Sequence, residues 1–600
     1  MNNYWRFCKN IIHIICAYLR IFTQILQTFL RKIKVSGGGR LKITYSKIKG
    51  IAFAALTIPS VIFVLGFLRW YIGFPVAVLI VAAYLFTLHD IKTADNGEKA
   101  INVPLWSLTV VFGTVIIWCY LGGLGNLWYQ SDDWSARNAI FRDLISHEWP
   151  VIYESKNVAL VYYIGFWLPS ALIGKVAFLI FGNLDAAFFI GNIALWLWSA
   201  FCIFTAFLLT ALFINANSTK RLFVALTVFI FFSGLDIVGA LYNFLVKDIS
   251  IGSHIEWWST YYQFSSMTTM LFWVFNQAIM TWLTVACFIN EKSPRNYAFL
   301  VVLCAASAPM PCVGIAVYML GFASYKLYKA IRAKKAPLFW RDVFTPQNLI
   351  PVFTLFPIYL TFYKTNLAVN VGKEIQSVRQ AVDRGAVTIF ATVLCAAVIM
   401  TLASAKHKRT WGEWLILSII TSFFLVAVIR ETSIRINYVF AILLEGIIFL
   451  IPLWSEYKRT PIFHTTLFLI MLSPTVRIGT AADFCMRASI PAIFVLMALC
   501  LRYLFSHSSK LLTRAGKNRQ HLITKVSCLW IIGCITIGTL TPFTEFKRGF
   551  DEVIENKSIV LVNDTTYTFD QIFVGEFLNL DRNFIAENYE KSFFFRYLAK

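Results

Sequence analysis

The sequence predicts an all-α polytopic membrane protein. Of its 600 residues, 58% are hydrophobic and only 14% are charged, whereas soluble proteins carry about 25% charged residues. Apolar runs of nearly 20 residues recur along most of the chain, and each is long enough to cross the roughly 30 Å hydrocarbon layer of a bilayer. Lysine and arginine gather in the short polar segments between these runs, as in cytoplasmic loops.

The net charge of +23 has the same origin. Basic residues collect in cytoplasmic loops of membrane proteins, so we expect no nucleic-acid partner. The 12 cysteines are scattered and contain no CxxC pair. The sequence therefore predicts neither a disulfide framework nor a zinc site.

The chain divides into five parts by its charges. Residues 1–50 hold ten Lys or Arg and no acid, which predicts a cytoplasmic segment with an amphipathic helix over 4–34 on the inner leaflet. Three spans follow within 51–121. An outer loop over 122–184 contains a juxtamembrane helix at 135–147. A helical bundle occupies 185–541, and the tail 542–600, with ten acids against seven bases, is placed outside.

About fifteen spans satisfy these charges, with the N-terminus inside and the C-terminus outside. One apolar segment, 158–181, would invert every later loop if it crossed, so we expect it to lie at the outer interface or to dip in and return. The predicted spans are 51–69, 72–89, 103–121, 185–214, 222–244, 266–289, 297–309, 312–328, 349–363, 386–404, 412–429, 438–454, 462–475, 490–505 and 525–541.

The outer loop holds two adjacent carboxylates, Asp132 and Asp133, in "SDDW". Paired carboxylates suit general-base chemistry, because one takes a proton from a hydroxyl while the other orients the acceptor or raises the base's pKa. The alternative is that they cap the helix 135–147, which explains one aspartate well and the second poorly. A third carboxylate, Asp236, lies inside an apolar run, where an ionisable residue is functional or paired for packing.

Several arginines of the outer segments suit a negatively charged ligand. Guanidinium groups bind phosphate oxygens in bidentate fashion. Arg487 begins a predicted helix, so it lies where a lipid phosphate would lie. The alternative for any single arginine is an interface anchor. This set is Arg137, Arg142, Arg430, Arg435, Arg477 and Arg487.

Two further outer groups carry weaker signals. His147, Glu148, His254 and Glu256 could bind a divalent cation such as Mg²⁺ or Mn²⁺, although their spacing matches no dedicated metal motif. Trp257 and its aromatic neighbours could stack on sugar rings, but aromatic residues also form belts at membrane interfaces.

Four segments resemble bacterial members of the GT-C glycosyltransferase superfamily, which includes protein O-mannosyltransferases and aminoarabinose transferases. They are "DDWSARNAIFRDLISHEWPV" (132–151), "FSGLDIVG" (232–239), "QFSSMTTMLFWVFNQAI" (263–279) and "DFCMRASIP" (483–491). The resemblance covers about residues 100–500. The chain lacks the large soluble C-terminal domain and the WWDYG-like run of oligosaccharyltransferases, which argues against transfer of a whole oligosaccharide to protein sequons.

The resemblance implies an inverting transferase in the bacterial inner membrane. It would move a sugar from a polyprenyl-phosphate donor to a glycan, lipid or protein acceptor on the extracytoplasmic face, among membrane lipids. One of the first-loop aspartates would be the base, and Arg487 or Arg477 would contact the lipid phosphate. The candidate catalytic residues are Asp132, Asp133 and Asp236. The candidate substrate-binding residues are Trp134, Arg137, Asn138, Arg142, His254, Glu256, Trp257, Gln263, Asn276, Gln277, Arg435, Arg477, Asp483 and Arg487.

Three alternatives stay open. A transporter or flippase of lipid-linked saccharides would also bind phosphate and sugar, but it predicts polar groups through the membrane midplane and on both faces. A polysaccharide polymerase would share an outer phosphate site and usually relies on arginines without paired carboxylates. A non-catalytic assembly protein would leave the aspartate pair without a role.

Overall fold

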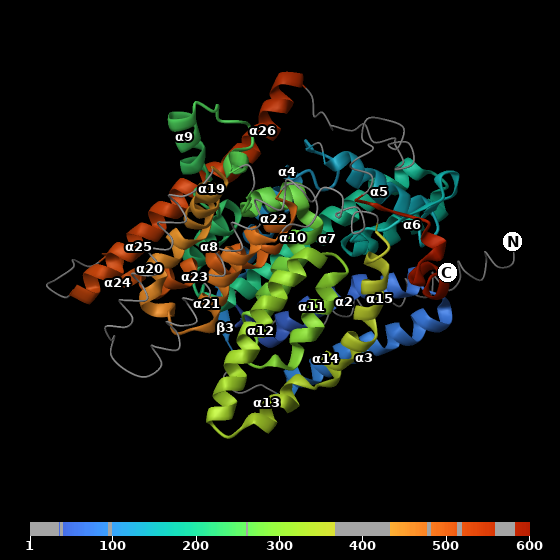
Figure 1. Ribbon diagram of the computed structural model, residues 1–600, viewed down its shortest axis with the longest axis horizontal. Helices are drawn as coiled ribbons and strands as arrows, with labels where there is room; N and C mark the ends of the chain where they lie inside the picture. Colours follow the sequence, from blue (N-terminus) through green and yellow to red (C-terminus); the bar gives the residue numbers. More distant parts are fainter. Residues whose placement is uncertain are drawn as a thin grey trace.

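The computed structural model is a bundle of helices with two small sheets (Figure 1). It describes residues 35–36, 40–93, 99–131, 133–259, 262–366, 433–476, 482–512, 519–557 and 583–600. The predicted amphipathic segment 4–34 and the predicted spans 386–404 and 412–429 lie outside these ranges.

Among the described residues, seven helical stretches are long and apolar enough to cross a membrane, or up to nine if each bent pair of helices counts as one span. The predicted class, a polytopic helical membrane protein, is supported at this level. The count of fifteen spans and the sidedness of the termini stay predictions. The long stretches are α2 (Tyr45–Phe67), α3 (Trp70–Thr93), α7 (Leu184–Phe213), α10 (Met267–Phe288), α12 (Pro309–Arg332), 437–457 and 520–556.

The two bent pairs are α8 with α9, and α13 with α14 and α15. Shorter helices complete the bundle. They are α4 (Leu105–Leu121), α5 (Trp134–Ser146), α6 (Leu168–Phe181), α8 (Thr219–Phe231), α9 (Asp236–Lys247), α11 (Tyr297–Ala305), α13 (Ala336–Val343), α14 (Pro346–Phe353), α15 (Leu355–Tyr363), α21 (Pro461–Leu472), α22 (Asp483–Ala488), α23 (Ile490–Ser506) and α24 (Ser508–Leu512). The long stretch 437–457 runs through α19 (Ser433–Ile442), η5 (Leu443–Ile447) and α20 (Ile448–Tyr457), and the stretch 520–556 runs through α25 (Arg519–Gly538) and α26 (Leu540–Asn556).

The segment predicted to avoid crossing begins as a strand and ends in α6, which has 14 residues. At 1.5 Å per residue this helix is about 21 Å long, too short for the hydrocarbon layer. Gly182, at φ 63°, ends α6 in the left-handed conformation, and the Asn183 side chain then accepts the first backbone N–H groups of α7. This sharp turn lays α6 against α7.

Helix α5 packs on α6 and α7 because two glycines clear its path. A Cβ on Gly174 would lie 2.6 Å from Ile145, and one on Gly191 would lie 2.9 Å from the same side chain. Larger residues at either position would push α5 outward. Helix α5 is thus held directly on the bundle.

The all-α prediction missed two three-stranded antiparallel sheets. One joins β1 (Val35–Ser36), β2 (Arg40–Thr44) and β3 (Ala100–Pro104), and the other joins β4 (Ile152–Tyr153), β5 (Val158–Leu160) and β6 (Ile585–Glu587). Strands of two to five residues give too little alternation to be recognised beside long apolar runs. The tail also contributes most of α26, which continues to Asn556.

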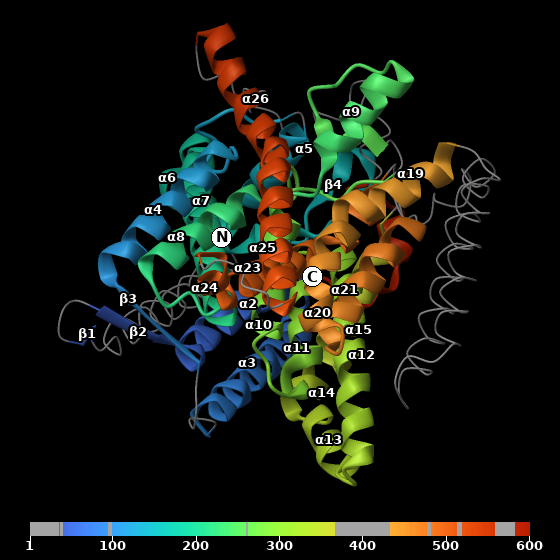
Figure 2. The same cartoon turned by 90° about the vertical axis from the view of Figure 1, so that its left-hand side faces the viewer.

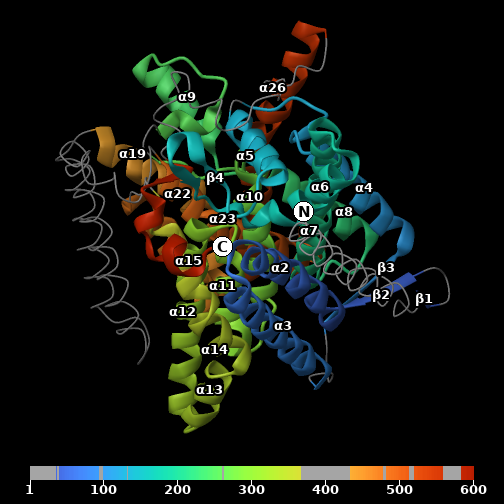
Figure 3. The ribbon, with the colours of Figure 1, turned by 90° about the vertical axis from the view of Figure 1, so that its right-hand side faces the viewer.

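One end of the bundle carries α5, α9 and α26, and the loop around α13 lies at the opposite end (Figures 2 and 3). Helix α10 runs through the centre and is buried along almost its whole length. Its regular geometry is broken at Val274, at φ −138° and ψ 36°. Many of the candidate residues form two clusters next to the first part of α10, from its start to just past Val274.

Candidate functional site

A first cluster begins at Asp133, which precedes α5. Its side chain makes no capping hydrogen bond to the helix. It accepts instead a hydrogen bond from Arg137 Nη2 at 2.8 Å, and the carboxylate is half exposed. Capping therefore does not account for Asp133. The other carboxylate of the pair, Asp132, lies outside the described residues.

The Arg137 side chain is 6% exposed. Its guanidinium lies 6.0 Å from the ring centroid of Phe275, and Nη1 has no hydrogen-bond partner among the described residues. A buried guanidinium with one unused donor edge is ready to bind an anion.

Arg487 repeats this arrangement from α22. It lies 2.5 Å from Asp483, four residues earlier, and its Nε finds no hydrogen-bond partner in the part of the chain that the structure describes. Burial lowers the pKa of Arg487, but Asp483 and two nearby phenols outweigh burial, so the pKa stays above its ordinary value. The group is therefore a permanent cation in a mostly buried setting.

The positive charges of both arginines act on Tyr162 and Tyr163. Burial raises the pKa of both phenols, and the positive charges of Arg487 and Arg137 oppose that rise in each case. The two rings are 3.6 Å apart between centroids. Sequence reasoning missed both tyrosines, although "YYIGF" directly follows a short strand in the outer loop. Together, Asp133, Arg137, Tyr162, Tyr163, Asp483 and Arg487 form the arginine–tyrosine cluster.

Trp134 and Asn138 brace this cluster from α5. The Trp134 ring stacks on Phe275 at 4.8 Å, and its Nε1 donates to the Phe272 carbonyl at 3.0 Å. Asn138 donates to Gln130, which in turn donates to a carbonyl of the outer loop. Both side chains are buried, so their contacts are with the protein.

Three other candidate residues, Arg142, Asn276 and Gln277, have surroundings of their own. Arg142 pairs with Asp185 at 2.6 Å and lies over the ring of Phe188, tying α5 to the start of α7. Asn276 and Gln277 lie just after the break in α10, buried in its interior. Asn276 Nδ2 and both polar atoms of the Gln277 amide lack hydrogen-bond partners among the described residues.

A second cluster surrounds Asp236 where three helices are interrupted. Helices α8 and α9 break before Asp236, η5 (Leu443–Ile447) is a π-turn, and α25 ends at Gly538. The backbones touch there: Leu235 N donates to Leu444 O at 3.2 Å, and a Cβ on Gly538 would lie 2.8 Å from the carbonyl of Gly234. Broken helices at membrane depth occur where they are buried in protein or line a cavity.

Asp236 and Glu445 are both buried, and Glu445 Oε2 lies where a Cβ on Gly234, two residues before Asp236, would be. Asp236 accepts hydrogen bonds from Ser233 at 2.9 Å and Thr541 at 3.1 Å, and Trp258 donates to Glu445 at 3.3 Å. Two buried carboxyl side chains therefore lie close together at the three helix breaks.

The second cluster continues outward through Glu256 and His254. Glu256 accepts from Gln263 at 2.9 Å and from Ser266 N at 2.8 Å. His254 Nδ1 lies 3.0 Å from Glu545, which also pairs with Arg548 at 3.2 Å. We call Asp236, His254, Glu256, Gln263, Glu445, Glu545 and Arg548 the carboxylate cluster.

Two outer groups of the carboxylate cluster have raised pKa values. Burial raises the pKa of Glu256 to about 7, and the Asp236 carboxylate acts in the same direction. Burial lowers the pKa of His254, but its hydrogen bond to Glu545 and the nearby carboxylates outweigh this, so the pKa of His254 lies above its ordinary value. Both groups therefore favour their protonated forms.

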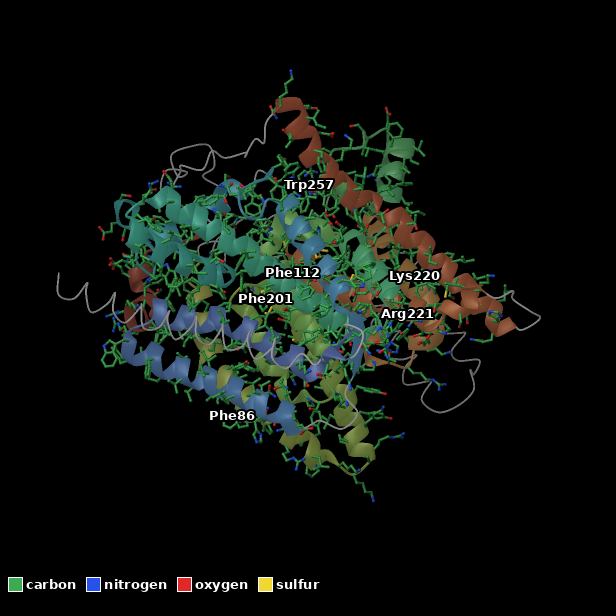
Figure 4. All side chains as sticks on the ribbon, turned by 180° about the vertical axis from the view of Figure 1, so that it is seen from behind. Phe86, Phe112, Phe201, Lys220, Arg221 and Trp257 are labelled. Atoms are coloured by element: carbon green, nitrogen blue, oxygen red, sulfur yellow. The ribbon has the colours of Figure 1, made fainter. Side chains whose placement is uncertain are left out.

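Sequence reasoning missed Glu445 and Glu545. Glu445 has the same signal as Asp236, a single acid inside the apolar run "AILLEGIIFL" (441–450). Trp257 is 62% exposed and its ring packs 4.7 Å from that of His254. Figure 4 shows it near the end of the molecule that carries α26, away from the basic pair Lys220 and Arg221.

Within the described ranges, no three His, Cys, Asp or Glu side chains are placed to hold a metal ion. The four candidate ligands His147, Glu148, His254 and Glu256 are all described and belong to no such group. Arg477 lies outside the described residues, as does the side chain of Arg435.

Comparisons with protein-family models, with curated proteins and with solved structures find no match to this chain.

Proposed function

We propose that the protein transfers a sugar from a polyprenyl-phosphate donor to a hydroxyl of a glycan, lipid or protein acceptor. The observation that carries this proposal is a pair of buried arginines, Arg137 and Arg487, each with a donor that no described residue accepts. Two such guanidinium groups suit the phosphate of a lipid-linked sugar.

The reaction needs a base and a site for negative charge. The acceptor oxygen attacks the anomeric carbon, the bond from that carbon to the phosphate oxygen breaks, and the electron pair leaves on the phosphate. Arg137 and Arg487 would stabilise this growing charge. A carboxylate would take the acceptor's proton. Asp133 is suited to this role because it is half exposed and adjoins Arg137, and Asp132 precedes it in the chain.

The position of the cluster fits a membrane-dissolved donor. Helix α5 and the short helix α22 lie toward the end of the bundle that carries α9 and α26 (Figure 3). The sides of the bundle are apolar, with side chains such as Phe86 exposed (Figure 4). A donor held in the bilayer by its polyprenyl chain would present its phosphate at this end. We propose that this end faces the exterior of the bacterial inner membrane.

The test is donor turnover by protein in nanodiscs, with radiolabelled polyprenyl-phosphate sugars. Asp133→Asn and Asp132→Asn separate the two candidate bases, and Arg137→Lys and Arg487→Lys test the phosphate contacts. Asp551→Asn and Arg341→Lys change exposed residues elsewhere and serve as controls. We expect one aspartate variant to lose transfer while it still binds polyprenyl phosphate. Normal turnover in both aspartate variants would refute the assignment of the base.

The Asp236–Glu445 pair favours a second candidate, proton-coupled transport of a lipid-linked saccharide. Carboxyl side chains buried at membrane depth mark proton pathways in pumps and transporters. Protein reconstituted in liposomes would then move an intact lipid-linked sugar, with rates that depend on a proton gradient. Glu445→Gln should abolish that dependence. Cleavage of the donor without movement would reject transport.

A further inference from the structure

The C-terminal segment Asn583–Lys600 lies against Tyr162 of the arginine–tyrosine cluster, although more than 400 residues separate the two in sequence. Strand β6 pairs antiparallel with β5, with Ile585 opposite Leu160 and Glu587 opposite Val158. Strand β5 ends at Leu160, two residues before Tyr162. The segment thus completes the sheet that ends just before the two tyrosines.

The residue before Tyr162 is held on both sides of its backbone. Val161 N donates to Phe584 O at 2.8 Å. Asn366 Nδ2 donates to Val161 O at 2.6 Å and also to Asn583 O at 2.9 Å. One asparagine therefore ties the strand end and the C-terminal segment together at a single peptide.

The ring of Tyr162 is held as firmly as its backbone. Its centroid lies 4.6 Å from that of the Phe584 ring and 3.6 Å from that of the Tyr163 ring. The next turn is fixed too, because Gly165 N donates to Ala306 O at 3.0 Å with no room for a Cβ. The pair of phenols has little freedom to move.

The far end of the segment is anchored next to α2. Arg69 Nε donates to Ala599 O at 2.9 Å, and Arg69 Nη2 donates to Arg596 O at 3.0 Å. The ring of Phe594 packs 4.9 Å from that of Phe362, within the aromatic core beside α2. With both ends attached, the segment forms a strap between the end of α2 and the outer loop.

We propose that this strap is a working part of the site, in which Phe584 and Asn366 are positioning residues that set where the Tyr162–Tyr163 pair meets the donor's phosphate. The inference rests on the proposed sugar transfer. Neither residue needs to touch the donor. A displacement of about 1 Å in a positioning group can lower kcat/KM by up to roughly 100-fold.

The experiment uses the full chain in nanodiscs with the variants Phe584→Ala, Phe584→Tyr and Asn366→Ala. Phe593→Ala is the matched control, because Phe593 belongs to the same strap, is 59% exposed and stacks only on its neighbour Tyr597 among the described rings. The readouts are KM and kcat for the polyprenyl-phosphate sugar, the Kd for polyprenyl phosphate, the melting temperature, and hydrogen exchange of 158–166.

We expect Phe584→Ala and Asn366→Ala to raise the donor KM and the Kd by roughly tenfold, with a smaller change in kcat. Phe584→Tyr keeps the aromatic ring, so its donor KM and its Kd should equal those of wild type. Phe593→Ala should also match wild type. Hydrogen exchange should increase at 158–166 in the two alanine variants.

If the strap variants show faster exchange or a lower melting temperature but unchanged KM and Kd, the strap has only a structural role and the inference is overturned. The proposed sugar transfer would not be affected by that result. If wild-type protein binds polyprenyl phosphate but never cleaves a donor, the transfer reaction fails. Unchanged Kd values in the strap variants would then reject the positioning role as well. Absence of any phosphate binding in wild type would reject both.

Discussion

Replacing Glu256 by glutamine should flatten the pH dependence of the protein's stability. The pKa of Glu256 is about 7 in the folded protein, against 4.5 for an ordinary glutamate. A carboxyl group that binds its proton more tightly when folded adds stability at low pH, and this contribution is lost as the pH rises from 4.5 through 7. At about 1.4 kcal/mol for each pH unit, the full loss is about 3 kcal/mol.

His254 acts in the same direction. Its pKa is raised in the folded state, so its contribution is present below its unfolded pKa and disappears as the pH rises through the folded value. Wild-type protein should therefore be more stable at pH 5 than at pH 8. In Glu256→Gln the part due to Glu256 is removed. The introduced amide can still accept from Ser266 N, and the Gln263 amide can turn over to accept from it.

The assay is thermal unfolding in one detergent between pH 5 and pH 8, with the exposed Glu555→Gln as a control. We expect Glu256→Gln to unfold at a higher temperature than wild type at pH 8, with a gap that shrinks towards pH 5. The difference should correspond to about 2 to 3 kcal/mol across that range. Parallel pH profiles for wild type and variant would show that Glu256 ionises normally, and would refute the argument from its burial.

Three further changes test the arginine–tyrosine cluster. Trp134→Phe removes the donor to the Phe272 carbonyl and should lower the free energy of unfolding by about 2 kcal/mol, measured by denaturant unfolding; an unchanged value would contradict the hydrogen bond. Gly165→Ala places a Cβ 2.6 Å from Ala306 O, so both the melting temperature and the affinity for polyprenyl phosphate should fall, and a loss of neither would show that the turn can open. Tyr162→Phe should raise the donor KM several-fold at an unchanged melting temperature, and an unaltered KM would remove its phenol from the site.

Local features of the chain were predictable. The apolar runs indicate the spans, and "DDWSARNAIFRDLIS" places an acid and a base four residues apart, the spacing at which Asp133 and Arg137 pair on α5. The acid inside "SGLDIVG" marked Asp236 as unusual. These signals act within one or two helical turns, where sequence spacing translates directly into geometry.

Contacts between distant segments were not predictable in the same way. Glu445 lies 209 positions after Asp236, and nothing in either apolar run indicates that three helix breaks would bring their carboxyl groups together. Strand β6 has three residues, too few to show an alternating pattern. Its pairing with β5 and the place of Phe584 beside Tyr162 are therefore visible only in the folded chain.

The break at Val274 constrains how this sequence can change. In a regular helix the Phe272 carbonyl would accept a hydrogen bond from the backbone N–H four residues later. Here it accepts a hydrogen bond from the indole of Trp134, which lies on α5. A substitution that straightened α10 would leave the Trp134 indole without its acceptor. A substitution that removed the indole would leave a carbonyl exposed inside the bundle. Trp134 and the irregular turn should therefore be inherited together, and lost together, in any descendant of this chain.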